Sequence, residues 1–165
     1  MDYHLHEFRI TLTKRPLREA IIHIGIPSKE DADWGMEKMT EWETHLDDWF
    51  PTKVKQAVYT YDFGDSWDHT VLFEKELTAE VGQKYPCCIA GKRACPPEDC
   101  GNIPGYERVI KIMANPKHKE HRETVEWLNL DSARDFDPEH FDPSEVEFDN
   151  PRERLKEVLA HKDEY

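Results

Sequence analysis

The sequence contains no apolar run that approaches the roughly 20 residues of a membrane-spanning helix. Its N-terminal stretch, MDYHLHEF, also lacks the basic and apolar regions of a signal peptide. We therefore expect a cytoplasmic protein that does not insert into a membrane. Cysteines stay mostly reduced in that compartment, so the four cysteines point to metal binding or packing and not to disulfides.

Several catalytic signatures are missing too. There is no Gly-x-Ser-x-Gly elbow for a serine nucleophile and no glycine-rich loop to cradle a phosphate. The densest basic group, Lys14, Arg15 and Arg18, is small, and the formal net charge of −13 repels phosphate backbones. These absences disfavour elbow-type serine hydrolases, P-loop nucleotide hydrolysis and nucleic-acid binding.

The composition nevertheless describes a folded protein. Charged residues make up 35% of the 165 residues, but five tryptophans, seven phenylalanines and six tyrosines argue against disorder. A chain of this length can bury a core without disulfides. We expect one domain over residues 1–165, with an acidic surface.

The most distinctive stretch is Tyr59–Phe73, YTYDFGDSWDHTVLF, which crowds aromatic residues, aspartates and a histidine together. The alternation of aromatic and polar residues before Gly64 predicts a half-buried strand. Gly64-Asp65 then predicts a two-residue reversal with glycine at the position of positive φ. This turn places three pairs opposite each other across the hairpin, namely Asp62 with Trp67, Tyr61 with Asp68, and Thr60 with His69.

Strands are expected early in the rest of the chain and helices late. The apolar patterns predict strands at Tyr3–Leu12 and Ala20–Ile26, joined by a turn at Thr13–Pro16, and an exposed loop at Ser28–Gly35. A short helix is expected between Thr44 and Pro51, with Trp42, Leu46 and Trp49 facing the core. The second hairpin strand is expected to close at Glu76–Glu80.

The later part of the chain is expected to begin with a long ordered loop at Val81–Pro104, because prolines, glycines and cysteines are dense there. Four helical segments should follow, at Gly105–Ala114, at His121–Leu130, as a single turn at Pro138–Phe141, and from Pro151 with Leu155, Val158 and Leu159 facing inward. This order favours an α+β fold, with a mostly antiparallel sheet built on the central hairpin and helices packed on one face.

Spaced motifs occur along most of the chain. YHLHEFRI at Tyr3–Ile10, GIP at Gly25–Pro27, YDFGDSWDH at Tyr61–His69, ACPPEDCG at Ala94–Gly101, Gly105-Tyr106, NPKHKEH at Asn115–His121 and FDPEHFD at Phe136–Asp142 follow one another in this order. Together they resemble the plasmid pRiA4b ORF-three-like family, some members of which carry the label of transposon-passenger TnpR-like proteins. The resemblance implies an α+β fold and says little about chemistry.

The TnpR-like label suggests a serine recombinase, which the residues do not support. Ser66, the only serine of the motifs, lies in an acidic turn without an arginine cluster to stabilise a phosphoryl transition state. The family also implies a strand and a helix before YHLHEF, so we expect either a start codon downstream of the usual one or a shortened form. In both cases an uncovered sheet edge or core face would favour self-association. Asn102 stands where the family more often has glycine.

Two kinds of metal site are candidates. Cys88, Cys95 and Cys100 could complete a tetrahedral zinc site with His69 or His118, although their spacing lacks paired two-residue knuckles and small buried thiols in a tight loop are the favoured alternative. His4 and His6 project to one face of a strand and form a weaker candidate pair.

A catalytic candidate comes from the acids of the hairpin and the cysteine loop. Its members are Asp62, Asp68, His69, Glu98 and Asp99. Carboxylates and an imidazole that converge on one divalent cation with an open position can activate water. The alternative is that these acids only shape turns and cap backbone amides.

A binding surface is the third candidate, formed by Trp67, Tyr61 and Tyr106, since aromatic residues anchor protein interfaces. Core packing is the alternative for most aromatics of a domain this size. The sequence therefore favours an interaction or accessory protein, linked to mobile elements, that binds a protein partner or itself. The alternative is a metal-dependent, hydrolase-like enzyme using zinc or another divalent cation, with its site where the hairpin, the cysteine loop and the helix start at His118 meet.

Overall fold

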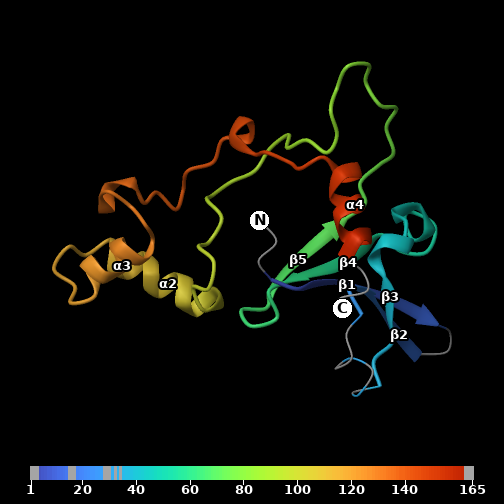
Figure 1. The fold of residues 1–165 in the computed structure, drawn as a ribbon, viewed down its shortest axis with the longest axis horizontal. Coiled ribbons are helices and arrows are strands. Elements are labelled where there is room, and N and C mark those ends of the chain that lie inside the picture. The colour runs from blue at the N-terminus through green and yellow to red at the C-terminus, as the bar shows by residue number, and fades with distance from the viewer. Residues whose placement is uncertain (1–3, 15–17, 28–30, 32, 34, 162–165) are drawn as a thin grey trace. The chain divides into compact units, whose positions relative to one another are not determined.

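Figure 1 shows the fold, taken from a computed structural model that describes residues 4–14, 18–27, 31, 33 and 35–161. The chain divides into two compact units. The first comprises Met1–Val81 with Asp149–Tyr165, and the second is Gly82–Phe148. The single domain over residues 1–165 stays a prediction.

The first unit contains a five-stranded sheet in the order β3-β2-β1-β4-β5. Its strands are β1 (His6–Lys14), β2 (Arg18–Gly25), β3 (Lys38–Thr40), β4 (Gln56–Tyr61) and β5 (Trp67–Leu72). β2 and β3 pair in parallel, and the other three pairs are antiparallel. The predicted α+β class and mostly antiparallel sheet are therefore confirmed, and the hairpin β4–β5 forms one edge of that sheet.

One face of this sheet holds the hydrophobic core. Ile10, Ile24 and Ala57 come from three adjacent strands and are buried together with Trp49 from the segment after β3. Side chains alternate across a strand, so the residues between these positions face the other way, and many of them are polar or charged. Burial on one face alone explains the alternating pattern in the sequence.

The segment between β2 and β4 differs from its prediction. It contains the unpredicted strand β3 and two short 3-10 turns, η1 (Glu41–Glu43) and η2 (Leu46–Asp48), where one helix was expected. His45 and Asp48 form a capping box around η2, which satisfies the first amides of that turn. Trp49 is buried as predicted, whereas Leu46 is 71% exposed, so its assignment to the core was wrong.

The register of the central hairpin is one residue away from the predicted one. The observed pairs are Tyr61 with Trp67, Thr60 with Asp68, and Tyr59 with His69. The connection is the longer loop from Asp62 to Ser66, whose two end residues have φ values of 56° and 54°. Aspartate tolerates the left-handed region through its own hydrogen bonds, so Asp62 and Ser66 reverse the chain instead of Gly64.

The predicted ends of several other segments also change. β5 stops at Leu72, so the expected continuation of the strand to Glu80 was wrong. Residues 73–101 form neither helix nor strand, which agrees with the predicted loop at Val81–Pro104. Most of the predicted loop Ser28–Gly35 and part of the turn Thr13–Pro16 lie outside the described residues. Asp31 is described and is buried in a 3.0 Å ion pair with Lys38, so it is not part of an exposed loop.

The second unit contains α2 (Asn102–Met113) and α3 (His121–Trp127), both close to their predicted positions. α2 buries Val109, Ile112 and Met113. The expected helical turn at Pro138–Phe141 was wrong, because the 3-10 turns η3 (Ala133–Asp135) and η4 (Pro143–Glu145) lie on either side of it. The packing of these helices on the sheet stays a prediction.

The last helix, α4 (Pro151–His161), belongs to the sheet unit and begins where the sequence predicts. The Asn150 side chain accepts a 3.0 Å hydrogen bond from the Arg152 amide, which is the expected cap. Leu155 and Leu159 are 44% and 42% exposed, so their predicted burial was wrong. Across the described residues, no helix is both long enough and apolar enough to cross a bilayer.

Candidate functional site

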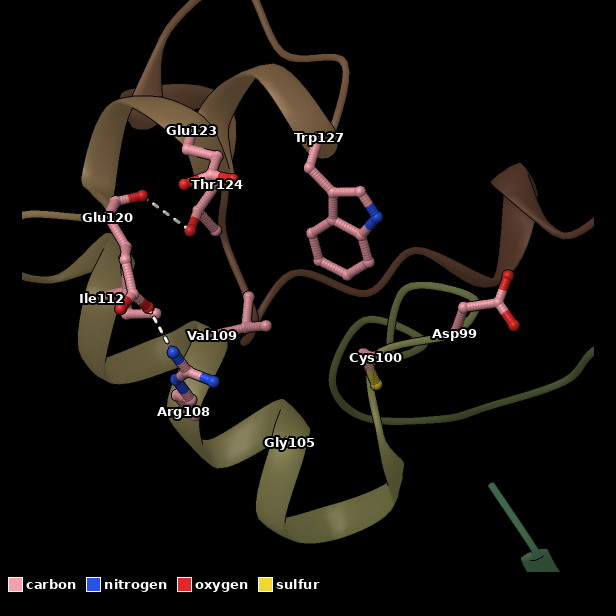
Figure 2. Close-up of a pocket in the computed structure, with 10 residues that line it drawn as sticks. All are labelled: Asp99, Cys100, Gly105, Arg108, Val109, Ile112, Glu120, Glu123, Thr124 and Trp127. Carbon is pink, nitrogen blue, oxygen red and sulfur yellow. Dashed lines mark hydrogen bonds and ion pairs between the residues drawn. The ribbon is translucent and has the colours of Figure 1, made fainter. Parts of the chain in front are cut away.

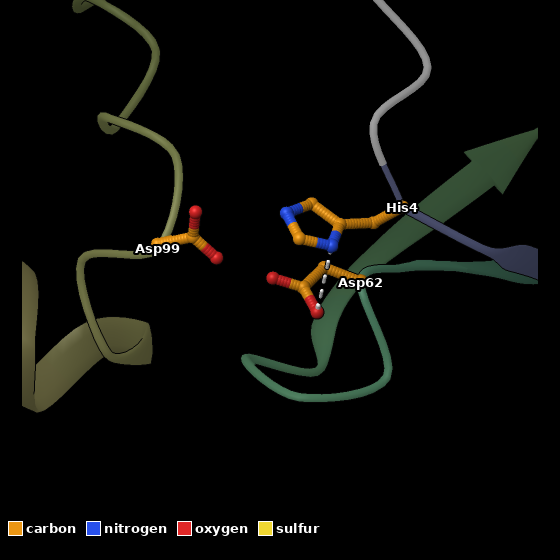
Figure 3. Close-up of side chains that lie close together, drawn as sticks. All are labelled: His4, Asp62 and Asp99. Atoms are coloured by element: carbon orange, nitrogen blue, oxygen red, sulfur yellow. Dashed lines mark ion pairs between the residues drawn. The ribbon is translucent and has the colours of Figure 1, made fainter.

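Asp62 is a buried carboxylate at the closed end of the hairpin. The residue is 5% exposed, and its Oδ1 lies 3.8 Å from the imidazole Nδ1 of His4 (Figure 3). Its side chain accepts a 2.8 Å hydrogen bond from the Gly64 amide, and its own amide donates to the Leu5 carbonyl at 3.0 Å. Asp62 therefore organises the turn and also holds a negative group beside a histidine.

Asp68 belongs to a row of charges on the sheet face opposite the core. Arg9 donates to both of its carboxylate oxygens at 2.9 Å, and the Thr60 hydroxyl donates at 2.5 Å. Arg9 also lies 3.8 Å from Glu7, which is 3.1 Å from His23. The hydrogen bond from Thr60 lowers the pKa of Asp68, and Arg9 lowers that pKa further. The carboxylate is occupied by these partners.

This ion pair predicts a dependence of stability on pH. The pKa of Asp68 in the folded chain lies below the ordinary value of 3.8, so ionised Asp68 stabilises the folded state above that pH. The contribution disappears as the pH falls through the folded pKa. Carboxyl NMR of the wild type should therefore show Asp68 titrating below 3.8, and in Thr60→Val the pKa should move back towards 3.8. An unchanged pKa in Thr60→Val would contradict the role of the hydroxyl, and Thr70→Val on β5 is the matched control.

His69 points to the other face of β5, because successive residues of a strand alternate. Its Nδ1 is 3.3 Å from the Tyr59 carbonyl oxygen, and the two rings are 5.7 Å apart. The sheet unit therefore does not bring the predicted catalytic residues Asp68 and His69 to one point. His6, on the same face as His69, contacts Glu41 at 2.9 Å.

The predicted binding residues Trp67 and Tyr61 form a cross-strand pair at the same hairpin end. Both are half-buried, and the Tyr61 ring meets the imidazole of His4 edge-on at 5.8 Å. Cross-strand aromatic pairs stabilise a sheet, which is a packing role. Their partial exposure also leaves part of each ring available at the start of β5.

The four cysteines in the second unit form no disulfide, and their environments differ. Cys100 is buried, Cys88 is half-buried and donates to the Ala90 carbonyl at 3.7 Å, and Cys87 and Cys95 are exposed. Partial desolvation of the Cys95 thiol raises its pKa, and the nearby charge of Glu98 raises it further. A raised pKa keeps this thiol protonated at neutral pH, which makes it a poor nucleophile.

The predicted zinc set is not assembled in this unit. Within Gly82–Phe148, no three cysteine, histidine or acidic side chains have ligand atoms within 4.8 Å of one another. His118 instead accepts a 3.2 Å hydrogen bond from the Glu120 amide, and His121 bonds the Ile112 carbonyl at 2.9 Å. Both histidines thus organise the connection from α2 to α3. Metal binding by the cysteines stays a prediction.

The remaining predicted residues lie where the cysteine loop enters α2. Glu98 and Asp99 are exposed, and Asp99 has a φ of 55°. Tyr106 is half-buried, and burial raises the pKa of its hydroxyl, followed by the influence of Cys100 and Cys95. Asn102, the departure from the family's glycine, has a φ of 60°, a conformation that asparagine tolerates better than most residues.

Two pockets include residues that the sequence analysis did not single out. The pocket between α2 and α3 has a volume of about 530 Å³ and includes Arg108, Glu123 and Trp127 (Figure 2). A pocket of about 410 Å³ in the sheet unit begins where β5 ends. The spacing of Glu123 and Trp127, one helical turn apart, was a signal for the first. The second had no signal, because it joins segments far apart in the sequence.

The strand order, the hairpin and the cysteine loop that leads into α2 define an α+β protein with a mixed five-stranded sheet. The chain belongs to the family described as plasmid pRiA4b ORF-3-like protein, whose match spans residues 1–145. The family resemblance seen in the sequence motifs is therefore confirmed.

Two relatives are informative about the extent of the likeness. The chain is 34% identical over 135 residues to the uncharacterized protein y4hQ of Sinorhizobium fredii, which covers 81% of this chain and 61% of the relative. It is also similar to MM3350 from Methanosarcina mazei Go1, a protein of unknown function with a crystal structure. The sequence identity is 40% and the TM-score is 0.71, and the match covers 90% of this chain and 75% of that one. The chain thus spans less than two thirds of the length of y4hQ.

Proposed function

We propose that this chain is a cytoplasmic interaction or accessory protein, linked to mobile elements, whose sheet edge at β5 binds an extended segment of a partner protein. The observation that carries the proposal is the exposed edge strand itself. β5 is the outermost strand of the sheet, pairs with β4 without a bulge, and contains neither proline nor lysine. Bulges, prolines and lysines usually protect natural edge strands. An edge strand without them is a template for strand addition.

The direction of the backbone groups of β5 follows from its ladder. The Phe73 amide donates to the Lys55 carbonyl at 2.9 Å, and residues of an antiparallel pair alternate between inward and outward hydrogen bonding. The amides of Thr70 and Leu72 therefore face away from β4. Thr70 is exposed, so its outward amide and carbonyl are accessible to an added strand.

The chemistry of the partner segment follows from the pocket at the end of β5. Phe50, Val71 and Phe73 line it, and the rings of Phe50 and Phe73 stack at 6.1 Å. Among the described residues that line it, the charged ones are Asp47 and Glu76, both acidic. With a chain charge of −13, this surface favours a segment that places an apolar side chain in the pocket and basic residues beside it.

A substitution that removes one outward amide tests this proposal. Thr70→Pro deletes the outward N–H and leaves the inward ladder intact, since proline is tolerated in edge strands. Peptides selected on the wild type from a random displayed library should bind Thr70→Pro about tenfold more weakly, because a peptide carbonyl loses its donor. Thr70→Val, which keeps the amide, should bind like the wild type in the same calorimetric titration.

Three results would count against the proposal. Equal binding of the selected peptides to both variants would show that the edge is not used. Selected peptides without basic and apolar residues would contradict the inferred chemistry. A concentration-dependent wild-type dimer that Thr70→Pro disrupts, seen by light scattering, would assign the edge to a second copy instead. Matching thermal melts of the two variants would confirm that both are folded.

A further inference from the structure

We infer that the pocket between α2 and α3 binds an alkylammonium group, that is, an organic cation carried on an apolar stem. This site lies in the second unit and is independent of the β5 edge proposed above. Figure 2 shows the indole of Trp127 extending from α3 into the space between α2 and the loop at Cys100. The volume of about 530 Å³ falls within the range of small-molecule sites.

The charges around the pocket select against anions. Three carboxylates line it, those of Asp99, Glu120 and Glu123, against one guanidinium, that of Arg108. Arg108 is already paired with Glu120, and this hydrogen bond lowers the pKa of Glu120, which stays ionised at neutral pH. Lys119 also lies 3.5 Å from Glu120, so both of these cations pair with Glu120, and the carboxylate of Glu123 remains to attract a cation.

The arrangement on α3 adds an aromatic surface to this negative charge. Glu123 and Trp127 are four residues apart on one helix and therefore share a face. Trp127 is 47% exposed, so part of its indole stays accessible. An ammonium group over an indole gains cation–π attraction, and a carboxylate one turn away on the helix neutralises its charge.

The inner wall of the pocket explains why the cation should have an apolar stem. Val109 and Ile112 of α2 line it, and both are buried, at 7% and 5% exposure. Methylene groups against these side chains leave water, which is favourable. A small hydrated inorganic cation could not use this surface, whereas a lysine side chain or a free alkylamine could.

Calorimetric titration of the full chain with n-hexylammonium chloride tests the inference, with n-hexanol and sodium hexanoate as probes of the same stem. We expect saturable binding of the ammonium only. Trp127→Ala should weaken it about tenfold, since a partly desolvated cation–π contact is of that size. Glu123→Gln should weaken it about fivefold. Competition by spermidine or by Nα-acetyl-lysine methylamide would assign the group to a free polyamine or to a lysine side chain.

The control for general attraction to an acidic protein is Glu126→Gln. Glu126 is on the same helix, is paired with Arg122 at 2.9 Å, and does not line the pocket, so its loss changes the chain charge equally. Absence of hexylammonium binding, or equal weakening by Glu123→Gln and Glu126→Gln, would overturn the inference. Trp127→Phe, which keeps an aromatic face, should retain more affinity than Trp127→Ala and distinguishes lost stacking from lost folding.

Discussion

Gly105→Ala should lower the free energy of unfolding of the unit Gly82–Phe148 by about 3 kcal/mol, the upper part of the usual range for overpacking. A Cβ at this position would lie 1.8 Å from the Cys100 carbonyl oxygen and 2.8 Å from its carbon. Both are backbone atoms, so the clash cannot be relieved by a side-chain rotation. The cysteine loop would have to move away from the first turn of α2.

The sign of this effect makes the test decisive. Gly105 lies within α2, where helix propensity alone predicts that alanine would stabilise by about 1 kcal/mol. Hydrogen exchange of the α2 and α3 amides measures the stability of this unit separately from the sheet. Glu107→Ala, at an exposed position of the same helix, should change it by less than about 0.5 kcal/mol. A Gly105→Ala variant as stable as the wild type would show that Cys100 does not pack there.

Asp62→Ala should destabilise the sheet unit by about 2 kcal/mol, through two separate losses. The Gly64 amide loses its acceptor, a 2.8 Å hydrogen bond in the present turn. Alanine must also adopt a φ of 56°, which costs about 1 kcal/mol for a residue with a Cβ and no polar side chain. Protection of the β4 and β5 amides from hydrogen exchange should fall accordingly.

Asp62→Asn distinguishes the contribution of the turn geometry to stability from the contribution of the negative charge. Asparagine keeps an acceptor for the Gly64 amide and tolerates the left-handed region, so it should lose less than half as much stability as alanine. If both variants are equally unstable, the negative charge beside His4 matters more than the geometry of the loop.

The hairpin shows which structural features local sequence patterns can predict. Period-two alternation located β4 and β5, and the proline-rich composition located the cysteine loop, because both signals come from neighbouring residues. The register was missed by one residue, since Gly64 was taken as the residue of positive φ and the side chain of Asp62 stabilises a longer loop instead. β3 was missed because its three residues pair in parallel with β2, a contact that leaves no local pattern.

For the elements and site residues too, local patterns identified some features, and only the tertiary structure revealed the others. Periodicity and capping identified α2, α3 and α4, and the spaced motifs identified the family, because each depends on residues close in the chain. The spacing of Glu123 and Trp127 indicates only that they share a helix face, and both pockets depend on which segments pack together. The roles of Asp68 and Gly105 are of this second kind: Asp68 is occupied by Arg9 from another strand, and Gly105 lacks a side chain because the Cys100 backbone lies against it. Local composition specifies the elements, whereas partners distant in sequence specify what each functional group contacts.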